Sequence, residues 1–216
     1  HLFPRSFLSL IAIISALASL AMSQSKTSVI AMVAGLFTYK LFMRKSRISC
    51  GIVMMVTYIA FIFGWLIYMN TQPYLPTNEF TSITGRTDIW DVALEIWSSN
   101  LLLGAGLRPF SPELMAAEGL TGAVNAHNQF LITATTVGWV GVSALSVFVA
   151  LLVLEPLRSR YCSTPPVLVA TYSGMTVFIL VRGTTESVFA LTGVDLILIL
   201  IALSTIRLGK LWGQRT

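Results

Sequence analysis

One histidine is the residue best suited to proton transfer in this 216-residue chain. His127 lies in the segment VNAHNQFLITATTVGWVG, and the only other histidine is the first residue of the chain. A histidine can accept or donate a proton near neutral pH, so His127 could act as a general base. Asn125 and Asn128 stand beside it and could orient its ring by hydrogen bonding. The alternative is that His127 caps a helix or lies at an interface.

Four basic residues from separate segments of the chain could bind an anion: Lys26, Arg86, Arg108 and Arg182. The planar guanidinium group of arginine binds two phosphate oxygens at once and keeps its charge. We expect these cations to converge on an anion site, although each could instead pair with a nearby carboxylate or a lipid phosphate. Arg182 and Glu186 are four residues apart and could neutralise each other. Asp195 lies within an apolar run, where a carboxylate is costly enough to need a buried partner or a function.

The sequence lacks the ligand patterns of a metal centre. It contains no HExxH or DxD motif, and Asp88 and Asp91 are three residues apart. Cys50 and Cys162 lie far apart with no CxxC spacing, so neither a disulfide nor a metal framework is expected. We expect no metal and no cofactor.

The composition decides which elements must position these residues. Hydrophobic residues make up 55% of the chain and charged residues 11%, whereas an average soluble domain carries about 25% charged residues. A soluble globular protein is therefore excluded, and so is a disordered chain, which requires low hydrophobicity and high charge. A helical membrane protein with several spans remains. We expect membrane lipids, and no nucleic acid, around it.

The apolar runs predict an all-α bundle of about six membrane spans, since a helix needs about 20 apolar residues to cross a bilayer. The predicted spans are Phe7–Met22, Val29–Phe42, Ile48–Met69, Phe130–Leu154, Pro166–Val181 and Val188–Ile206. They form a single membrane domain, residues 1–216, with one long loop at residues 70–126. We expect the chain to be part of a longer protein.

The long loop contains a predicted amphipathic helix in the segment GRTDIWDVALEIWSSNLLLGAG. Apolar residues recur there at helical spacing. Thr87–Asp88 suits the start of a helix, and Asn100 with Gly104 suits its end. Trp90 and Trp97 lie seven residues apart on one face, as rings at the lipid headgroups would. We expect a short helix on the outer membrane surface, and packing against the spans is the alternative.

The basic residues predict how the chain is oriented in the membrane. Alternating six spans places 10 of the 14 lysines and arginines on one face, which is therefore cytoplasmic. The long loop, His127 and the four candidate anion-binding cations then lie outside. Seven carboxylates lie there too, so the outer face is net acidic and any anion must be held by specific placement of the cations.

The segment from His127 to Gly141 resembles the His-[Asn/Ser/Gln]-x9-Gly-x-x-Gly signature of O-antigen ligase and polymerase-like membrane proteins. His127-Asn128 is followed by nine residues and then by GWVG. GRTDIW and NLLLGAG resemble the family's Arg-containing loop and its Asn-Pro-Leu-Leu-Gly-x-Gly segment, with Leu101 in place of proline. SQSKT resembles the family's Ser-x-Ser-Arg-Thr turn with Lys26 in place of arginine, and TTESVF resembles a Glu-containing stretch near its end. The resemblance covers nearly the whole chain, as the carboxy-terminal half of longer proteins.

The resemblance implies inverting glycosyl transfer on the outer, periplasmic face of the bacterial inner membrane. The donor would be a glycan on undecaprenyl pyrophosphate, and the acceptor a sugar hydroxyl on lipid A-core or on another lipid-linked glycan. His127 would take the acceptor proton, and Arg86 would stabilise the leaving pyrophosphate without a metal. Asn128 and Glu186 would support them. The remaining cations would bind the pyrophosphate: Lys26, Arg108 and Arg182.

Two alternatives come from other classes of protein. A transporter or flippase of lipid-linked sugars or small anions could use the same outer cations. Such a protein should carry polar residues through the bilayer, whereas Asp195 is the only clear charge deep in a predicted span. A purely structural role in the membrane would not explain why the outer cations and His127 are present.

Overall fold

The computed structural model describes residues 26–44, 86–120, 126–159, 165–184, 186 and 194–213. Within these residues the chain is all-helical, which confirms the predicted class. The described helices are α2 (Lys26–Arg44), α4 (Arg86–Ser99), α5 (Pro112–Ala117), α6 (Gln129–Ser159), α7 (Pro166–Arg182) and α8 (Val194–Gly213). The predicted spans Phe7–Met22 and Ile48–Met69 lie outside the described residues.

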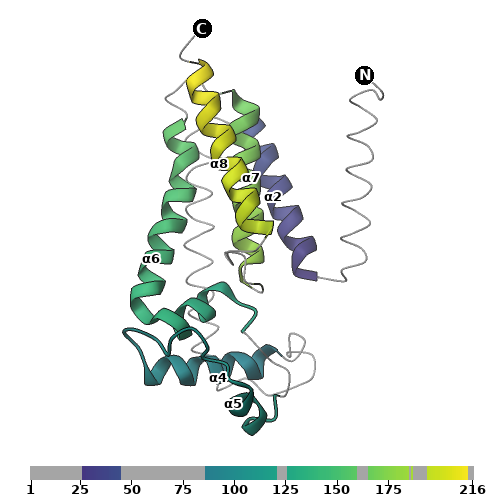
Figure 1. Ribbon diagram of the computed structural model, residues 1–216. Coiled ribbons are helices and arrows are strands. Elements are labelled where there is room, and N and C mark those ends of the chain that lie inside the picture. Colours follow the sequence, from purple (N-terminus) through teal and green to yellow (C-terminus); the bar gives the residue numbers. More distant parts are fainter. Residues whose placement is uncertain are drawn as a thin grey trace, which may run out of the picture.

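Four of the helices lie side by side as a bundle: α2, α6, α7 and α8 (Figure 1). Among the described residues one helix, over Gln129–Pro156, is long and apolar enough to cross a membrane. Three other helical stretches are apolar but shorter than this one: Thr27–Met43, Pro166–Arg182 and Asp195–Ser204. The described part of α8 begins at Val194, six residues after the predicted start of the last span.

Helices α2 and α7 approach each other closely at a pair of glycines. A Cβ atom added to Gly35 would lie 2.8 Å from the carbonyl oxygen of Gly174, and one added to Gly174 would lie 2.8 Å from that of Gly35. Small residues at a crossing allow two backbones to come into contact, as is common between membrane helices. On its other sides α7 contacts α6 and α8, and the buried Tyr172 hydroxyl donates a 2.9 Å hydrogen bond to the Leu152 carbonyl of α6.

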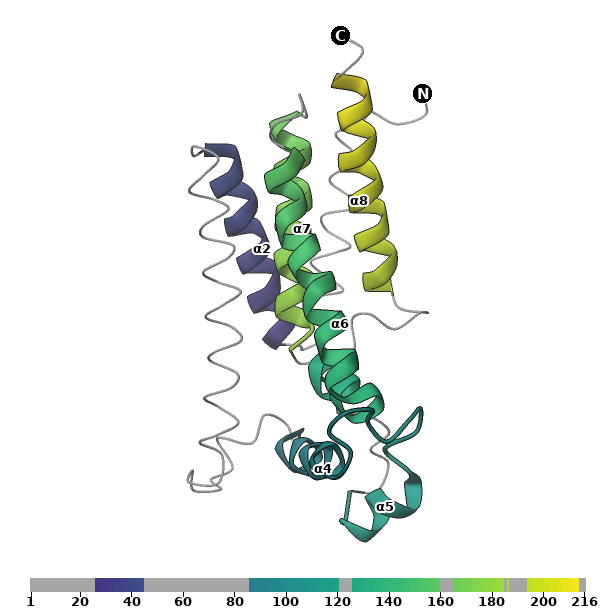
Figure 2. The ribbon, with the colours of Figure 1, turned by 90° about the vertical axis from the view of Figure 1, so that its left-hand side faces the viewer.

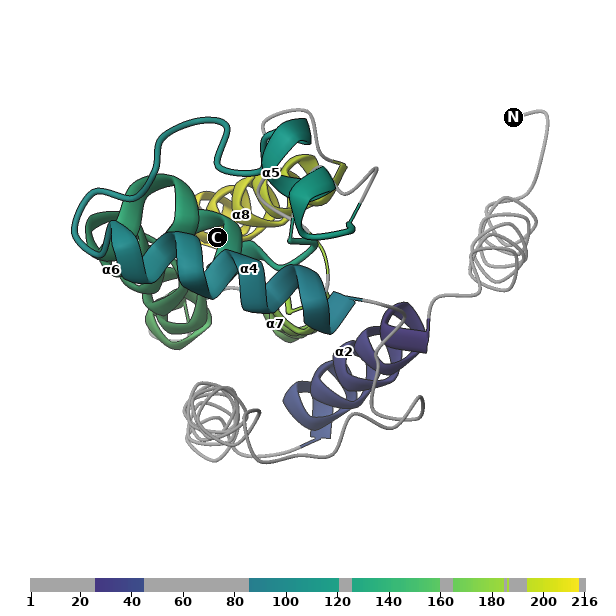
Figure 3. The ribbon, with the colours of Figure 1, turned by 90° about the horizontal axis from the view of Figure 1, so that it is seen from below.

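The predicted amphipathic helix is confirmed as α4, which lies across one end of the bundle beneath α6 (Figures 2 and 3). Its apolar face packs into a cluster with α5 and the first turn of α6, including Phe110, Met115 and Leu131. Trp90 is only 6% exposed, so packing and not a headgroup position accounts for this side chain. Trp97 packs against Trp139 of α6, with 5.1 Å between the ring centroids.

Helix α6 is kinked at Gly138, where φ is +63° and ψ is −154°. Only glycine adopts this conformation readily. The loop after α4 contacts the kink through its backbone, and it replaces hydrogen bonds that a straight helix would make within itself. The four bonds run from Ala105 N–H to Thr135 O (2.7 Å), Gly106 N–H to Thr136 O (3.1 Å), Trp139 N–H to Leu101 O (2.8 Å) and Val140 N–H to Leu102 O (3.3 Å). We call this contact the loop–kink seam.

Candidate functional site

His127 is held between two anchored residues at the start of α6. On one side, the Trp90 indole N–H donates a 2.7 Å hydrogen bond to the Ala126 carbonyl. On the other, the Asn128 carboxamide oxygen accepts from the N–H groups of Phe130 (2.9 Å) and Leu131 (3.2 Å). Asn128 is therefore the helix cap, and the alternative in which His127 caps the helix is wrong.

The backbone of His127 is strained. Its φ of +46° lies in the left-handed region, and no other non-glycine residue in the described part of the chain has a positive φ. A side chain in this region costs about 1–2 kcal/mol, and such strain persists only when the surroundings impose it, most often at functional sites. The anchored neighbours supply that constraint and hold the imidazole in a partly exposed position.

Glu186 lies beside the imidazole, and the supporting role that the resemblance implies for it stays a prediction. The His127 Nδ1 atom is 3.6 Å from Glu186 Oε2, and the two side chains are 40% and 32% exposed. A carboxylate beside one ring nitrogen can orient the imidazole. The pair can therefore accept a proton at a surface that water and substrates reach.

Arg182 and Asp195 form an ion pair, with 2.8 Å between Nη1 and Oδ1. Asp195 is 8% exposed and lies in the first turn of α8. The residues before Val194 lie outside the described part of the chain, so the position of Asp195 within its span stays a prediction. Asp195 has an ion-pair partner, the partly buried Arg182.

A backbone hydrogen bond joins these two pairs. The N–H of Gln129 donates to the carbonyl of Gly183 over 3.0 Å, which ties the start of α6 to the end of α7. His127 and Arg182 each lie within two residues of this bond, so the structure brings them to the same end of the bundle. Lys26 begins α2 and Arg86 begins α4, also at this end (Figure 1). The roles of the Lys26 and Arg86 side chains stay predictions.

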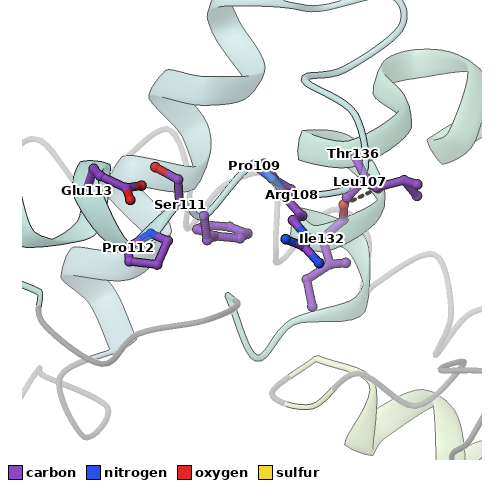
Figure 4. Close-up of a pocket in the computed structure, with 9 residues that line it drawn as sticks. Leu107, Arg108, Pro109, Ser111, Pro112, Glu113, Ile132 and Thr136 are labelled. Atoms are coloured by element: carbon purple, nitrogen blue, oxygen red, sulfur yellow. Dashed lines mark hydrogen bonds between the residues drawn. The ribbon is translucent and has the colours of Figure 1, made fainter.

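Arg108 is exposed and lines a pocket of about 640 Å³ between the loop after α4 and α6. In Figure 4 its guanidinium lies next to Ile132, and Glu113 lies at the far end of the row of labelled side chains. The described lining consists of Leu107, Arg108, Pro109, Phe110, Ser111, Pro112, Glu113, Ile132 and Thr136. His127 and the other three candidate cations are not among the described residues of this lining, so the predicted convergence of the four cations on one anion site is not seen at this pocket.

The charges on α4 add to the acidic character predicted for this end. Burial, with a smaller contribution from Asp88, raises the pKa of the Asp91 carboxyl above its ordinary value of 3.8. The two carboxylates are three residues apart, which places them on neighbouring turns of the helix. Within the described ranges, no group of three or more His, Cys, Asp or Glu side chains could hold a metal ion.

Sequence reasoning missed the loop–kink seam and the bond from Trp90 to Ala126. The glycines of NLLLGAG and GWVG were the only hint of the seam in these segments, because a glycine without a Cβ atom allows two backbones to come into contact. Nothing in the sequence relates Trp90 to a residue 36 positions away.

In its described part the protein is helical, with one helix long and apolar enough to cross a membrane and with His127 and Glu186 side by side at one end of the bundle. A sequence model of the family described as O-antigen ligase matches residues 10–146, more than half of the chain. The protein therefore belongs to the O-antigen ligase family, as the resemblance indicated, and this family consists of integral membrane glycosyltransferases of the ligase and polymerase type. The match includes His127 and the GWVG motif and ends before Arg182. No curated protein matches the chain.

Proposed function

We propose that this protein transfers a glycan from an undecaprenyl-pyrophosphate carrier to a sugar hydroxyl, with inversion at the sugar carbon. The single observation that carries the proposal is the partly exposed His127–Glu186 pair. Within it, His127 is held between anchored neighbours and lies in the residues that the family model matches. The acceptor is lipid A-core for a ligase or another lipid-linked glycan for a polymerase.

In the proposed reaction, His127 accepts the proton of the acceptor hydroxyl, with Glu186 beside its ring. The acceptor oxygen then forms a bond to the anomeric carbon, while the bond from that carbon to the pyrophosphate oxygen breaks. Negative charge develops on the leaving pyrophosphate. Fixed cations stabilise such charge without a metal, and this role goes to Arg86 with Lys26 and Arg182.

Arg182 is the cation whose surroundings are best defined. Its ion pair with Asp195 cancels part of its charge and holds the guanidinium in place. We propose that Arg182 contacts the pyrophosphate, because a guanidinium binds phosphate oxygens and keeps its charge. Arg108, at its own pocket, would meet a more distant part of the lipid-linked glycan.

The proposed setting is the bacterial inner membrane, with the chain as one membrane domain of about six spans. The end that carries α4, α5 and His127 would face the periplasm. The direction of the described helices supports this arrangement, because α2, α6 and α8 begin at that end and α7 ends there (Figures 1 and 2).

The proposal is tested in cells by His127→Ala and Arg86→Ala variants of the full-length protein, scored by surface polysaccharide. Loss of polymer in both variants at normal protein levels supports it, and wild-type glycan from both overturns it. Glycan analysis of a deletion strain separates the two acceptors. Loss of all polymer from the lipid anchor indicates a ligase, whereas single repeat units on the anchor indicate a polymerase.

A further inference from the structure

The loop–kink seam is a contact between two backbones with no room between them. A Cβ atom added to Gly104 would lie 2.5 Å from the Thr136 carbonyl carbon and the Val137 nitrogen. A Cβ atom added to Gly138 would lie 2.5 Å from the carbonyl group of Leu102. These neighbours are backbone atoms, so no side-chain rotation can relieve the clash. Only glycine at both positions permits the seam.

The seam fixes one end of a short segment of α6, residues 129–137. The other end is fixed by the hydrogen bond from Gln129 to Gly183 and by the Asn128 cap. The segment is therefore held at both ends, by the loop after α4 and by the end of α7. His127 comes directly before the capped end.

The same segment forms one wall of the Arg108 pocket. Ile132 and Thr136 line the pocket from α6, while the rest of its lining follows the seam along the chain, from Leu107 to Glu113 (Figure 4). A change at the seam would therefore move the two walls of the pocket relative to each other. It would also release the segment that begins beside His127.

We propose that Gly104 and Gly138 are positioning residues for the transfer reaction. By closing the seam they hold the Arg108 pocket and His127 in one fixed geometry, so that a glycan bound in the pocket is aligned with the base. This inference rests on the proposed function. Alignment matters because a displacement of about 1 Å can cost about 100-fold in rate.

The test compares Gly104→Ala with Gly119→Ala in the full-length protein. Gly119 also has a positive φ, +73°, but a Cβ atom there meets nothing within 4 Å. Both variants therefore place a side chain on a residue with positive φ, but only Gly104→Ala also makes the new Cβ atom clash with the backbone of α6. Turnover is measured per folded enzyme, with purified lipid-linked donor and sugar acceptor in detergent.

Gly104→Ala should lower kcat about tenfold or more. KM for the donor should rise by a smaller factor than kcat falls, because the displaced wall weakens binding while the polar groups of the pocket remain. A merely structural role would reduce the amount of folded enzyme and leave both constants unchanged. Gly119→Ala should behave as the wild type. Equal effects of the two variants on kcat would overturn the proposal.

Hydrogen exchange gives a readout that is independent of activity. In the wild type the seam amides of Ala105, Gly106, Trp139 and Val140 should exchange slowly, and Gly104→Ala should expose them. Fast exchange of these amides in the wild type would overturn the proposal even if the variant fails to fold. By contrast, full turnover by His127→Ala would overturn the proposed function and leave the seam result standing.

Discussion

Loss of the Arg182–Asp195 ion pair should lower the free energy of unfolding by an amount that depends on the exposure of the two side chains. The perturbation is Asp195→Asn, which keeps the size of the side chain and removes its charge. The charged atoms are 2.8 Å apart, and the side chains are 33% and 12% exposed. Removing one partner costs about 3–5 kcal/mol in a fully buried pair and about 0–1 kcal/mol in an exposed one.

The intermediate exposure of Arg182 gives an expected loss of about 1–3 kcal/mol, because water solvates part of the guanidinium that is left behind. For a chain of this length, a loss of about 2 kcal/mol lowers the melting temperature by about 4–8 °C. The assay is thermal unfolding of the purified full-length protein in detergent, followed by tryptophan fluorescence.

Two controls make the result specific to the pair. Glu118→Gln changes an exposed carboxylate at the end of α5 and should leave the melting temperature within about 1 °C. A double-mutant cycle with Arg182→Ala should give a coupling of about 0.5–3 kcal/mol. An unchanged melting temperature for Asp195→Asn, or a coupling near zero, would refute the reasoning that Asp195 holds Arg182.

Further predictions concern the surroundings of the histidine and the end of the bundle. Glu186→Gln should lower turnover about tenfold, because His127 loses the carboxylate that orients its ring; purified enzyme of unchanged stability and unchanged kcat would contradict this role. Trp90→Phe should reduce the free energy of unfolding by about 1–3 kcal/mol, because the buried Ala126 carbonyl loses its donor; thermal unfolding measures this, and an unshifted transition speaks against it. Asp91 has a raised folded-state pKa, so it contributes stability at low pH that is lost as pH rises through this pKa. Asp91→Asn should lack this loss as pH rises above the ordinary pKa of 3.8, and parallel stability curves for the variant and wild type would show that the shift is absent.

The sequence predicted the elements whose signals are local. Helix α4 was predicted from its spacing of apolar residues, and Pro166 marks the start of both the predicted fifth span and α7. Gly138 lies inside a continuous apolar run, so the sequence predicted one uninterrupted span where α6 has a kink.

The candidate site depends on contacts between distant segments, and these were only partly predictable. His127 and Glu186 were identified separately, but their approach to 3.6 Å depends on the junction of α6 with α7. The sequence left two carboxylates, Glu186 and Asp195, as possible partners of Arg182. In the structure Asp195 of α8 forms the ion pair. Spacing along the chain favoured Glu186, since four residues separate neighbours on a helix. However, α7 ends at Arg182.

The central claim is that His127 is the base of a glycosyl transfer. It is tested most directly by product formation from purified lipid-linked donor and acceptor in detergent micelles, where transport has no meaning. Full-length wild-type protein should form the glycosidic product, and His127→Ala should reduce the rate about 100-fold or more at unchanged melting temperature. Product formation by His127→Ala at the wild-type rate would contradict the claim, as would the absence of product from the wild type.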